Sequence, residues 1–378
     1  AHARARTNDV EVVGPLPGCP NTGWARRHPV WSQLAGVPAC GEYRGLPVFY
    51  PKYLHVPKLS GPWQPLLQAL SGRALCAGRH AQRPFDVIHA HWLYPDGVAA
   101  ALLAQRLRLP LVLTALGSDV NVAARYRLRR IQIQWALRRA ATVTAVSRAL
   151  VARLVEIGAP AARVHYIPNG IDAHKFSPPD SDATARARTA LGLDSEARYL
   201  LFVGRLHAVK GLHTLLQALA RLKAKGPLEF TTLLVGDGAE RRGLEAQASA
   251  LGLRDVVRFI GERPHDEISI WLRAADCFCL PSLMEGMPNV VLEASACGLP
   301  VVATNVGALP DMINPKTGVL VPPSDPNALA DAIARAFGTP WRRTDVAHAS
   351  LTQSWDAIAE RYNTVLAPGA AAAALQVT

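Results

Sequence analysis

The chain has 378 residues, enough for two domains of ordinary size. Hydrophobic residues make up 49% and charged residues 19%, so two cores can be buried and a largely disordered chain is excluded. The formal net charge is +12, and no apolar run approaches the roughly 18 residues that a membrane-spanning helix needs.

The positive charge is concentrated in the first half of the chain. Residues 1–170 hold 21 basic and 7 acidic residues, a net of +14, whereas residues 171–378 hold 20 and 22, a net of −2. The codon bias of a GC-rich genome explains why arginine outnumbers lysine, but not this segregation. The asymmetry predicts an anionic partner for the first half: a membrane surface, a nucleic acid or a phosphorylated substrate.

The first 65 residues are rich in Pro and Gly and predict loops with short strands, such as 10–13 and 47–50. An α/β domain usually opens with a strand, a turn and a helix before such elements, so we expect this chain to lack that portion. Strand–helix alternation begins at residue 86. It predicts strands at 86–89, 111–114, 142–146 and 164–167, and helices at 97–107, 125–140 and 147–158, the last capped by Ser147 and ended by Gly158.

A polar, Pro-rich stretch at 177–182 marks the expected domain boundary and separates this series from a second one. Leu212, Leu215, Leu216 and Leu219 recur at i, i+3, i+4 and i+7, which predicts an amphipathic helix. The second series further predicts strands at 199–203, 231–235, 256–260, 277–280 and 301–304, and helices at 239–251, 265–275, 288–297, 325–337 and 355–366. Two such series predict two doubly wound parallel sheets, whose ligands bind beyond the carboxyl ends of the strands, in the cleft between the domains.

Two cations and two glycines follow the strand at 199–203, in the run Gly204-Arg205-Leu206-His207-Ala208-Val209-Lys210-Gly211. Such a loop before a helix suits a diphosphate, because the helix dipole and free N–H groups favour anions and an arginine binds two oxygens. The spacing is not that of a Walker loop, and no Ser or Thr follows Lys210. The alternative is that Arg205 and Lys210 only solvate a helix end.

Two more loops follow strands of the second series. Gly236-Asp237-Gly238 does not complete the dinucleotide fingerprint, so a tight turn is at least as good an interpretation as a ligand loop. The run 282–289 contains Glu285 and leads into the helix that carries Glu293. A single Glu is usually a cap or part of a solvated face, but Glu293 has apolar neighbours, and a carboxylate there needs a hydrogen-bond donor. A ribose diol would supply two.

In the first series, His89 and His91 end one strand, and Thr114 and Asp119 follow the next. Zinc binding by the two histidines would need a third ligand at a standard spacing, which is missing, and a structural role for one or both is the alternative. Cys277-x-Cys279 lacks a second pair and lies in an apolar strand, so no metal is expected there. Six scattered cysteines do not make a disulfide scaffold, which indicates a reducing cytoplasm.

These motifs together carry a family resemblance. Glu285-Gly286-Met287-Pro288-Asn289, with Glu293 eight residues after Glu285, resembles the E-x7-E signature of the family-4 glycosyltransferases of the GT-B fold. Supporting motifs lie at 167–172, 203–211, 235–238 and 302–307. His89-Ala90-His91-Trp92 is similar to members that build bacterial exopolysaccharide, teichuronic-acid-like or lipopolysaccharide chains. The resemblance covers residues 86–365 and indicates the family more specifically than the substrate.

The resemblance implies two Rossmann-like domains that face each other across a cleft. We expect an acceptor-side domain at 1–171, a nucleotide-sugar domain at 172–348, and a final segment at 349–366 whose helix returns to the first domain. Members usually begin with a strand and a glycine-rich loop, which we expect to be missing here. Leu116 stands where the similar subgroup often has Arg, so contacts to the acceptor or the donor sugar are expected to differ.

The resemblance also implies roles for single residues. Arg205 and Lys210 hold the donor diphosphate and stabilise the departing nucleoside diphosphate. Glu293 binds the ribose, Glu285 holds donor-sugar hydroxyls, and His91 approaches the sugar from the first domain. The other expected donor contacts are Gly236, Asp237, Gly286, Met287, Pro288 and Asn289. Members need no metal, and no cofactor beside the nucleotide-sugar donor is implied, because the cations and the helix dipole do the work of a metal.

The implied function is a retaining hexosyltransferase that uses a UDP- or GDP-sugar, attacks from the front face without a protein nucleophile, and extends a lipid-linked or oligosaccharide acceptor in cell-surface polysaccharide biosynthesis. A phosphorylase on the same scaffold would need a pyridoxal-phosphate lysine site, which nothing indicates. A catalytically impaired nucleotide-sugar- or polysaccharide-binding subunit is the other alternative. No zinc finger or RNP motif is present, so no nucleic-acid partner is expected.

One helix of the basic half predicts contact with a membrane. Over 125–139, Leu128, Ile131 and Trp135 recur at i, i+3 and i+7, and we expect this stripe to pack on its own sheet. Arginines run along another face: Arg127, Arg130 and Arg138. If they face outward, an anionic leaflet attracts them. We therefore expect a cytoplasmic protein peripherally associated with the inner face of the plasma membrane.

Overall fold

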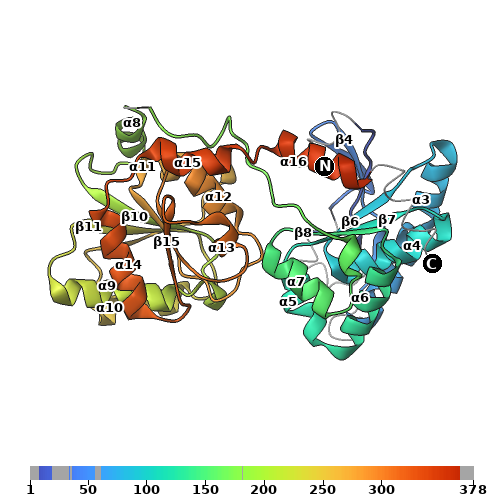
Figure 1. The fold of residues 1–378 in the computed structure, drawn as a ribbon, viewed down its shortest axis with the longest axis horizontal. Coiled ribbons are helices and arrows are strands. Elements are labelled where there is room, and N and C mark those ends of the chain that lie inside the picture. Colours follow the sequence, from blue (N-terminus) through green and yellow to red (C-terminus); the bar gives the residue numbers. More distant parts are fainter. Residues whose placement is uncertain (1–7, 19–33, 35, 56–60, 181, 367–378) are drawn as a thin grey trace. The chain divides into compact units, whose positions relative to one another are not determined.

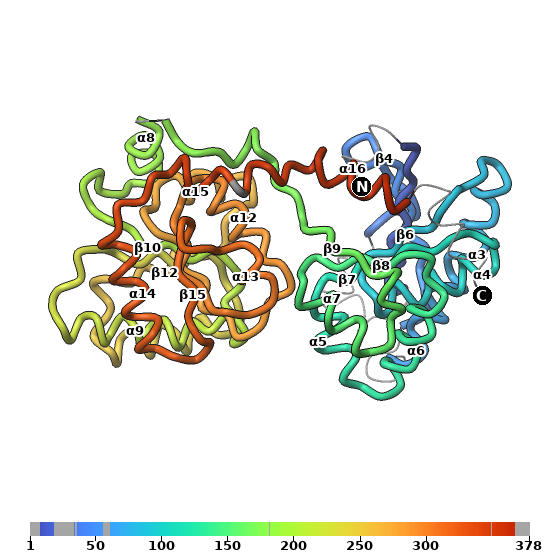
Figure 2. The backbone as a smooth tube through the Cα atoms, in the orientation of Figure 1, coloured from blue at the N-terminus to red at the C-terminus, as the bar shows by residue number. Residues whose placement is uncertain are grey.

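The computed structural model describes residues 8–18, 34, 36–55, 61–180 and 182–366 (Figure 1). The chain folds into two compact units. Unit 1 comprises Ala1–Pro168 and Ile358–Thr378, and unit 2 comprises Asn169–Ala357. Figure 2 traces both passages between the units, in green after Pro168 and in red within helix α16 (Trp355–Leu366).

Unit 1 is built on a four-stranded parallel sheet in the order β6-β7-β8-β9. Its strands are β6 (Ile88–His91), β7 (Leu111–Ala115), β8 (Thr142–Ala145) and β9 (Val164–Tyr166). Every residue of β7 and β8 is buried, as central strands of a parallel sheet are when helices cover both faces. The helices of this unit are α3 (Gln64–Gln82), α4 (Val98–Leu107), α5 (Ser118–Asn121), α6 (Arg127–Arg139) and α7 (Arg148–Glu156), joined by the end of α16.

Two small sheets precede the main sheet of unit 1. In one, β4 (Leu46–Phe49) pairs parallel with β1 (Val12–Val13) and antiparallel with β3 (Cys40–Tyr43). In the other, β2 (Leu16–Gly18) pairs parallel with β5 (Lys52–Leu54). The end of α16 belongs to the same unit, because Ile358 and Tyr362 pack in one buried cluster with Ile167, directly after β9.

Unit 2 holds a six-stranded, fully parallel sheet in the order β12-β11-β10-β13-β14-β15. Its strands are β10 (Arg198–Val203), β11 (Phe230–Val235), β12 (Val257–Gly261), β13 (Cys277–Leu280), β14 (Val301–Thr304) and β15 (Gly318–Val321). Its helices are α8 (Ala183–Ala190), α9 (Leu212–Lys225), α10 (Arg241–Ala250), α11 (Ile268–Ala274), α12 (Asn289–Ala296), α13 (Leu309–Met312), α14 (Pro326–Gly338) and α15 (Arg343–Leu351). Figure 1 shows α9, α10 and α14 on one face of the sheet and α11, α12 and α15 on the other.

The fold class predicted from the sequence is confirmed: each unit is an α/β structure around a parallel sheet. The four leucines of the predicted amphipathic helix all lie buried on α9. Ser147 caps α7 by accepting a hydrogen bond from the Leu150 backbone N–H, at 3.1 Å. The two units divide nearer the start of the chain than the Pro-rich stretch, because Ile171 and Phe176 are already buried in unit 2.

Several elements have no counterpart among the predicted ones, among them α3, α5, α8, α13, α15 and β15. Helix α3 carries Leu66 and Leu70 at helical spacing, but these leucines are exposed, and the residues that it buries are Pro65, Gln68, Ala69 and Gly72. The face that packs against α4 therefore consists of small and polar residues, which apolar periodicity does not identify.

The prediction for the buried face of α6 is wrong. The helix buries Ile133, Ala136 and Leu137, whereas Leu128 is 60% exposed and Ile131 is 51% exposed. Two side-chain amides that flank the buried face fix the rotation of α6 about its own axis. Gln132 Nε2 donates to the Pro62 carbonyl at 2.9 Å, and Gln134 Nε2 donates to the Ile157 carbonyl at 2.8 Å.

Candidate active site

The predicted residues of unit 2 gather where four neighbouring strands end. The loops 204–211, 236–240, 281–288 and 305–308 follow β10, β11, β13 and β14. These strands are parallel and adjacent, so their carboxyl ends share one edge of the sheet. Residues far apart in the sequence therefore become neighbours at this edge.

The four loops touch through their main chains. A Cβ atom on Gly236 would lie 2.0 Å from the Gly204 carbonyl oxygen, and one on Gly211 would lie 2.0 Å from the Pro281 carbonyl oxygen. Both glycines also have positive φ angles, of +132° and +65°. Gly236 is thus required by loop packing, which favours the tight-turn interpretation of Gly236-Asp237-Gly238. Hydrogen bonds join the same loops: Leu283 N to Val209 O at 2.7 Å, Leu206 N to Asp237 O at 2.9 Å and Ala308 N to Gly286 O at 2.9 Å.

Lys210 and Glu285, two residues predicted for the donor site, form an ion pair. Lys210 Nζ lies 2.7 Å from Glu285 Oε1, and the Ser282 hydroxyl donates to the same oxygen at 2.6 Å. The Glu285 side chain is only 10% exposed, so these donors stabilise its charge against the cost of burial. The Thr304 hydroxyl at the end of β14 donates to the Ser282 carbonyl and fixes the loop from the neighbouring strand.

Arg205 lies in the same loop as Lys210, with its side chain exposed to solvent. Asp237, by contrast, is already engaged. Its carboxylate accepts from the Gly238 N–H at 2.7 Å and lies 3.0 Å from Arg241 Nη1, and both partners lower the pKa of Asp237. The structure thus leaves the Arg205 guanidinium open to a ligand and gives Asp237 a role in closing a turn.

Glu293 lies in the middle of α12 and is buried. Its Oε1 atom lies 3.0 Å from His265 Nε2, and Lys175 Nζ lies 3.0 Å from the other nitrogen of that imidazole. The sequence predicted that Glu293 needs a hydrogen-bond donor, but His265 was not identified as that donor. The available signal was position: His265 follows β12, whose carboxyl end faces the same edge.

The segment between the two glutamates turns sharply before α12. Pro288 has extended backbone angles and precedes the helix, which begins at Asn289, one residue after the predicted start at 288. Asn169 contacts both sides of this turn: its backbone N–H points to Met287 Sδ at 3.1 Å and its side-chain amide donates to Asn289 Oδ1 at 2.7 Å. Gly286 accepts the Ala308 N–H described above, so the whole segment 286–289 is held in place.

In unit 1 the two histidines of β6 differ. His89 Nε2 lies 2.6 Å from the Thr114 hydroxyl, which lies 2.7 Å from the Thr144 hydroxyl, so His89 links three strands. The structural interpretation therefore applies to His89. His91 is exposed at the end of β6, and its ring lies 4.3 Å from that of His89. Among the described residues, His, Cys, Asp and Glu side chains form no group of three or more that could hold a metal ion.

Asp119 is fully buried and holds two loops of unit 1 together. Its carboxylate accepts backbone N–H groups of Leu93, Leu116, Gly117 and Val120 at 2.7–3.3 Å. Burial raises the pKa of Asp119, and the four hydrogen bonds oppose that change. All donors are backbone groups, which gives Asp119 a structural role.

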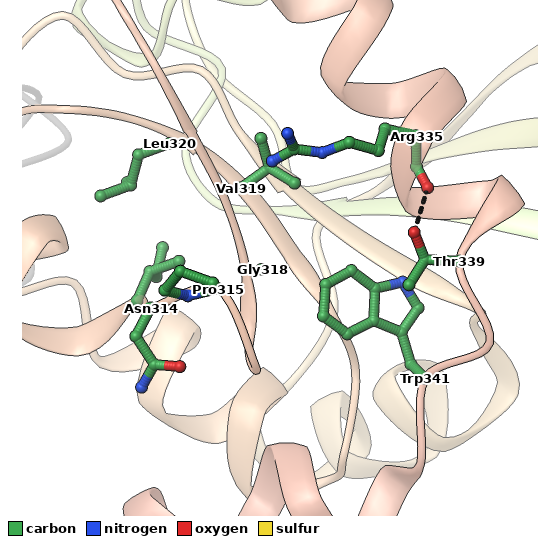
Figure 3. Close-up of a pocket in the computed structure, with 9 residues that line it drawn as sticks. Asn314, Pro315, Gly318, Val319, Leu320, Arg335, Thr339 and Trp341 are labelled. Carbon is green, nitrogen blue, oxygen red and sulfur yellow. Dashed lines mark hydrogen bonds between the residues drawn. The ribbon is translucent and has the colours of Figure 1, made fainter.

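A pocket of about 360 Å³ opens beside the edge strand β15 and α14 (Figure 3). Asn314, Leu320, Arg335 and Trp341 contribute to its lining, and Thr339 donates to the Arg335 carbonyl at its rim. None of the predicted site residues lines it. A diphosphate needs several cations and free N–H groups, and Arg335 is the single charged residue of this lining, so we place the candidate site at the strand-end loops.

Comparison with protein families gives two matches along the chain. Residues 1–170 match the model described as "Glycosyl transferase 4-like domain", and residues 184–350 match "Glycosyl transferases group 1". The second match contains Arg205, Lys210, Glu285 and Glu293. None of the helices in the described ranges combines the length and apolarity required to cross a bilayer.

Individual proteins are similar along most of the chain. A Bacillus subtilis protein named for teichuronic acid biosynthesis, the glycosyltransferase TuaC, is 32% identical over 77% of this chain and 71% of its own. A D-inositol 3-phosphate glycosyltransferase of Corynebacterium urealyticum is 35% identical over 73% and 71%. The crystal structure of Anabaena HepE in complex with UDP superposes with a TM-score of 0.75 at 21% identity, covering 94% of this chain and 99% of that one.

Proposed function

Because this chain belongs to the family-4 glycosyltransferases, we propose that it is a retaining hexosyltransferase that moves a sugar from a UDP- or GDP-sugar to a lipid-linked or growing saccharide acceptor. The observation that carries the proposal is the Lys210–Glu285 ion pair at the shared edge of β10 and β13, with Arg205 exposed in the same loop. The name of TuaC and the UDP complex of HepE support this class of acceptor and donor.

The donor diphosphate binds Arg205 and Lys210 at the N-terminal end of α9. Lys210 is paired with Glu285, and a diphosphate supplies oxygens that compete for its ammonium group. Glu285 then keeps the Ser282 hydroxyl as a donor, and its second oxygen accepts a hydroxyl of the donor sugar. As the sugar leaves, the two cations stabilise the negative charge that develops on the diphosphate, without a metal ion.

The nucleoside binds toward Glu293. Its Oε1 atom is occupied by His265, so Oε2 accepts the ribose hydroxyls. His91, exposed at the end of β6, is proposed to contact the donor sugar, as the family resemblance implies. The same groups suit any nucleoside diphosphate, and for this reason both UDP- and GDP-sugars belong in the test.

We also propose that the protein works in the cytoplasm, peripherally associated with the inner face of the plasma membrane, where a lipid-linked acceptor is exposed. The support is the net charge of +14 over residues 1–170. Anionic lipids attract such a surface, and the attraction fades within a Debye length.

The test is release of UDP or GDP from a panel of nucleotide sugars, with and without EDTA. We expect activity that EDTA leaves unchanged, and a loss of about a hundredfold or more for Arg205→Ala, in the range seen when a group that stabilises a developing anion is removed. Arg242→Ala, an exposed arginine on α10, is the matched control and should match the wild type. Turnover that requires added manganese or magnesium, or no turnover with any donor, would refute the proposal.

A further inference from the structure

Helix α6 exposes apolar side chains that a water-soluble surface would not favour. Leu128 and Ile131 lie on the side of α6 that faces away from the sheet, and Tyr126, which precedes the helix, is also exposed. These three residues span two turns of one helix end. Exposing these apolar side chains to water is unfavourable, so a partner that covers them would lower the free energy of the complex.

The beginning of α3 adds to this surface. Trp63 is 65% exposed, Leu66 and Leu70 follow at i+3 and i+7 on α3, and both are exposed as well. The Gln132–Pro62 hydrogen bond joins this end of α3 to α6. We call Trp63, Leu66, Leu70, Tyr126, Leu128 and Ile131 the apolar face of unit 1.

The stretch of sequence that contains α6 is rich in arginine and lacks acidic residues. Residues 120–155 contain eight arginines and no Asp or Glu. The nearest acidic residue before them, Asp119, is fully buried. The Arg129 guanidinium stacks 4.7 Å from the centre of the Tyr126 ring, and that of Arg139 stacks 4.3 Å from the Trp135 ring. Stacking covers one side of each guanidinium and keeps the positive charge beside the exposed aromatic ring.

This combination selects one kind of partner. A nucleic acid would satisfy the arginines but would leave Leu128 and Ile131 without an apolar contact. A second copy of the chain would bring its own arginines against these and repel them. The headgroup region of an anionic bilayer offers both phosphates for the arginines and acyl chains for Trp, Leu and Ile.

We propose that the apolar face of unit 1 inserts into the headgroup region of an anionic membrane, while Arg127, Arg130 and Arg138 bind lipid phosphates. The inference deepens the proposed function, since it identifies the surface on which a lipid-linked acceptor would be met. It also changes the expected mode of binding: electrostatic attraction brings the protein to the membrane, and insertion of apolar side chains holds it there.

The experiment is co-sedimentation of the full chain with phosphatidylcholine vesicles, with and without phosphatidylglycerol. We expect binding that requires the anionic lipid and that high salt weakens but does not abolish, because insertion is not screened. Each methylene withdrawn from water changes a partition coefficient about fourfold. Leu128→Ala with Ile131→Ala removes six carbons, so even partial insertion predicts a loss of at least about tenfold.

Two more variants make the result specific. Arg127→Gln, Arg130→Gln and Arg138→Gln combined should also weaken binding, by about fivefold for each arginine that contacts the leaflet. Tyr43→Ala is the matched control: Tyr43 is exposed on β3, which pairs with β4, and Figure 1 shows β4 at the opposite end of unit 1 from α6. It should bind like the wild type. All substituted side chains are exposed, so the unfolding midpoints should not change.

Three results would overturn the inference: no binding to anionic vesicles, equal binding to neutral vesicles, or unchanged binding of the Leu128→Ala, Ile131→Ala variant. A change of oligomeric state in that variant would show that the face meets protein instead. The assay contains neither donor nor acceptor, so its outcome is independent of sugar transfer. A chain that binds vesicles but transfers no sugar refutes the proposed sugar transfer alone. A chain that transfers sugar but ignores vesicles refutes the inference and the proposed membrane association, and leaves the proposed sugar transfer standing.

Discussion

Replacing Glu293 by alanine should weaken the binding of a nucleoside diphosphate far more than the same change at Glu285. Glu293 is buried, one of its oxygens lies 3.0 Å from His265 Nε2, and the proposed function assigns the other oxygen to the ribose hydroxyls. A hydrogen bond to a charged group contributes about 1.5–3 kcal/mol. Its loss corresponds to a decrease of about 10- to 150-fold in affinity.

Glu285→Ala should act in the opposite sense on binding. The carboxylate of Glu285 competes with the diphosphate for Lys210, so its removal leaves the ammonium group free for phosphate oxygens. We expect the affinity for UDP or GDP to be equal to that of the wild type or higher. Turnover with the nucleotide sugar should fall, because the sugar loses its carboxylate partner.

Isothermal titration calorimetry with UDP and GDP measures both effects directly. Glu267→Ala, at an exposed residue two positions after His265, serves as the control for the same region. Unfolding midpoints show whether any variant has lost its fold instead of its ligand. Equal losses of affinity for the Glu285 and Glu293 variants would refute this division of roles.

Three other predictions rest on single contacts. Gly236→Ala should lower the free energy of unfolding of unit 2 in urea by about 1–3 kcal/mol more than Gly252→Ala does. Both positions have positive φ, but only a side chain at Gly236 would meet a carbonyl oxygen, so equal losses would contradict this prediction. Burial raises the pKa of Cys297 to about 12, so iodoacetamide should label it only in the unfolded chain, as peptide mass spectrometry can show. The pKa of His213 is raised by the hydrogen bond between His213 and Glu240. The pair therefore stabilises the fold fully below pH 6.5, and this contribution is lost as the pH rises through the higher pKa of the folded state. In urea unfolding, His213→Gln should therefore be less stable than the wild type at about pH 5.5 and equally stable at about pH 9. The difference at pH 5.5 should be less than about 1 kcal/mol because the pair is partly exposed. A difference that grows with pH would contradict the assignment.

The sequence could predict that residues of the candidate site gather at one edge of the sheet, because the loops that carry Arg205, Lys210 and Glu285 follow apolar strands that the sequence marks clearly. Lys210 and Glu285 are 75 residues apart, yet parallel strands place their loops at one edge. The partners of these residues could not be predicted. Whether Ser282 or His265 reaches a carboxylate depends on how loops from different strands lie against one another, and this information is not local in the sequence.

The face that α6 turns toward the interior could not be predicted from the sequence either. Its sequence contains two possible inward faces, one with Leu128 and Ile131 and one with Ile133 and Leu137. Periodicity alone favours neither. The choice depends on the hydrogen bonds of Gln132 and Gln134 to segments outside the helix, and these partners exist only once the surrounding chain has folded.

The close main-chain contact among the four loops limits how this enzyme can diversify. A side chain added at Gly236 or Gly211 has no space, so neither position can be used to reshape the proposed donor site. An insertion in one loop would displace the loops beside it as well. New donor specificity is therefore accessible at side chains that already face solvent, such as Leu283, or by exchanging the loops as a set. Directed evolution of this chain should accept substitutions at Leu283 and reject them at the glycines.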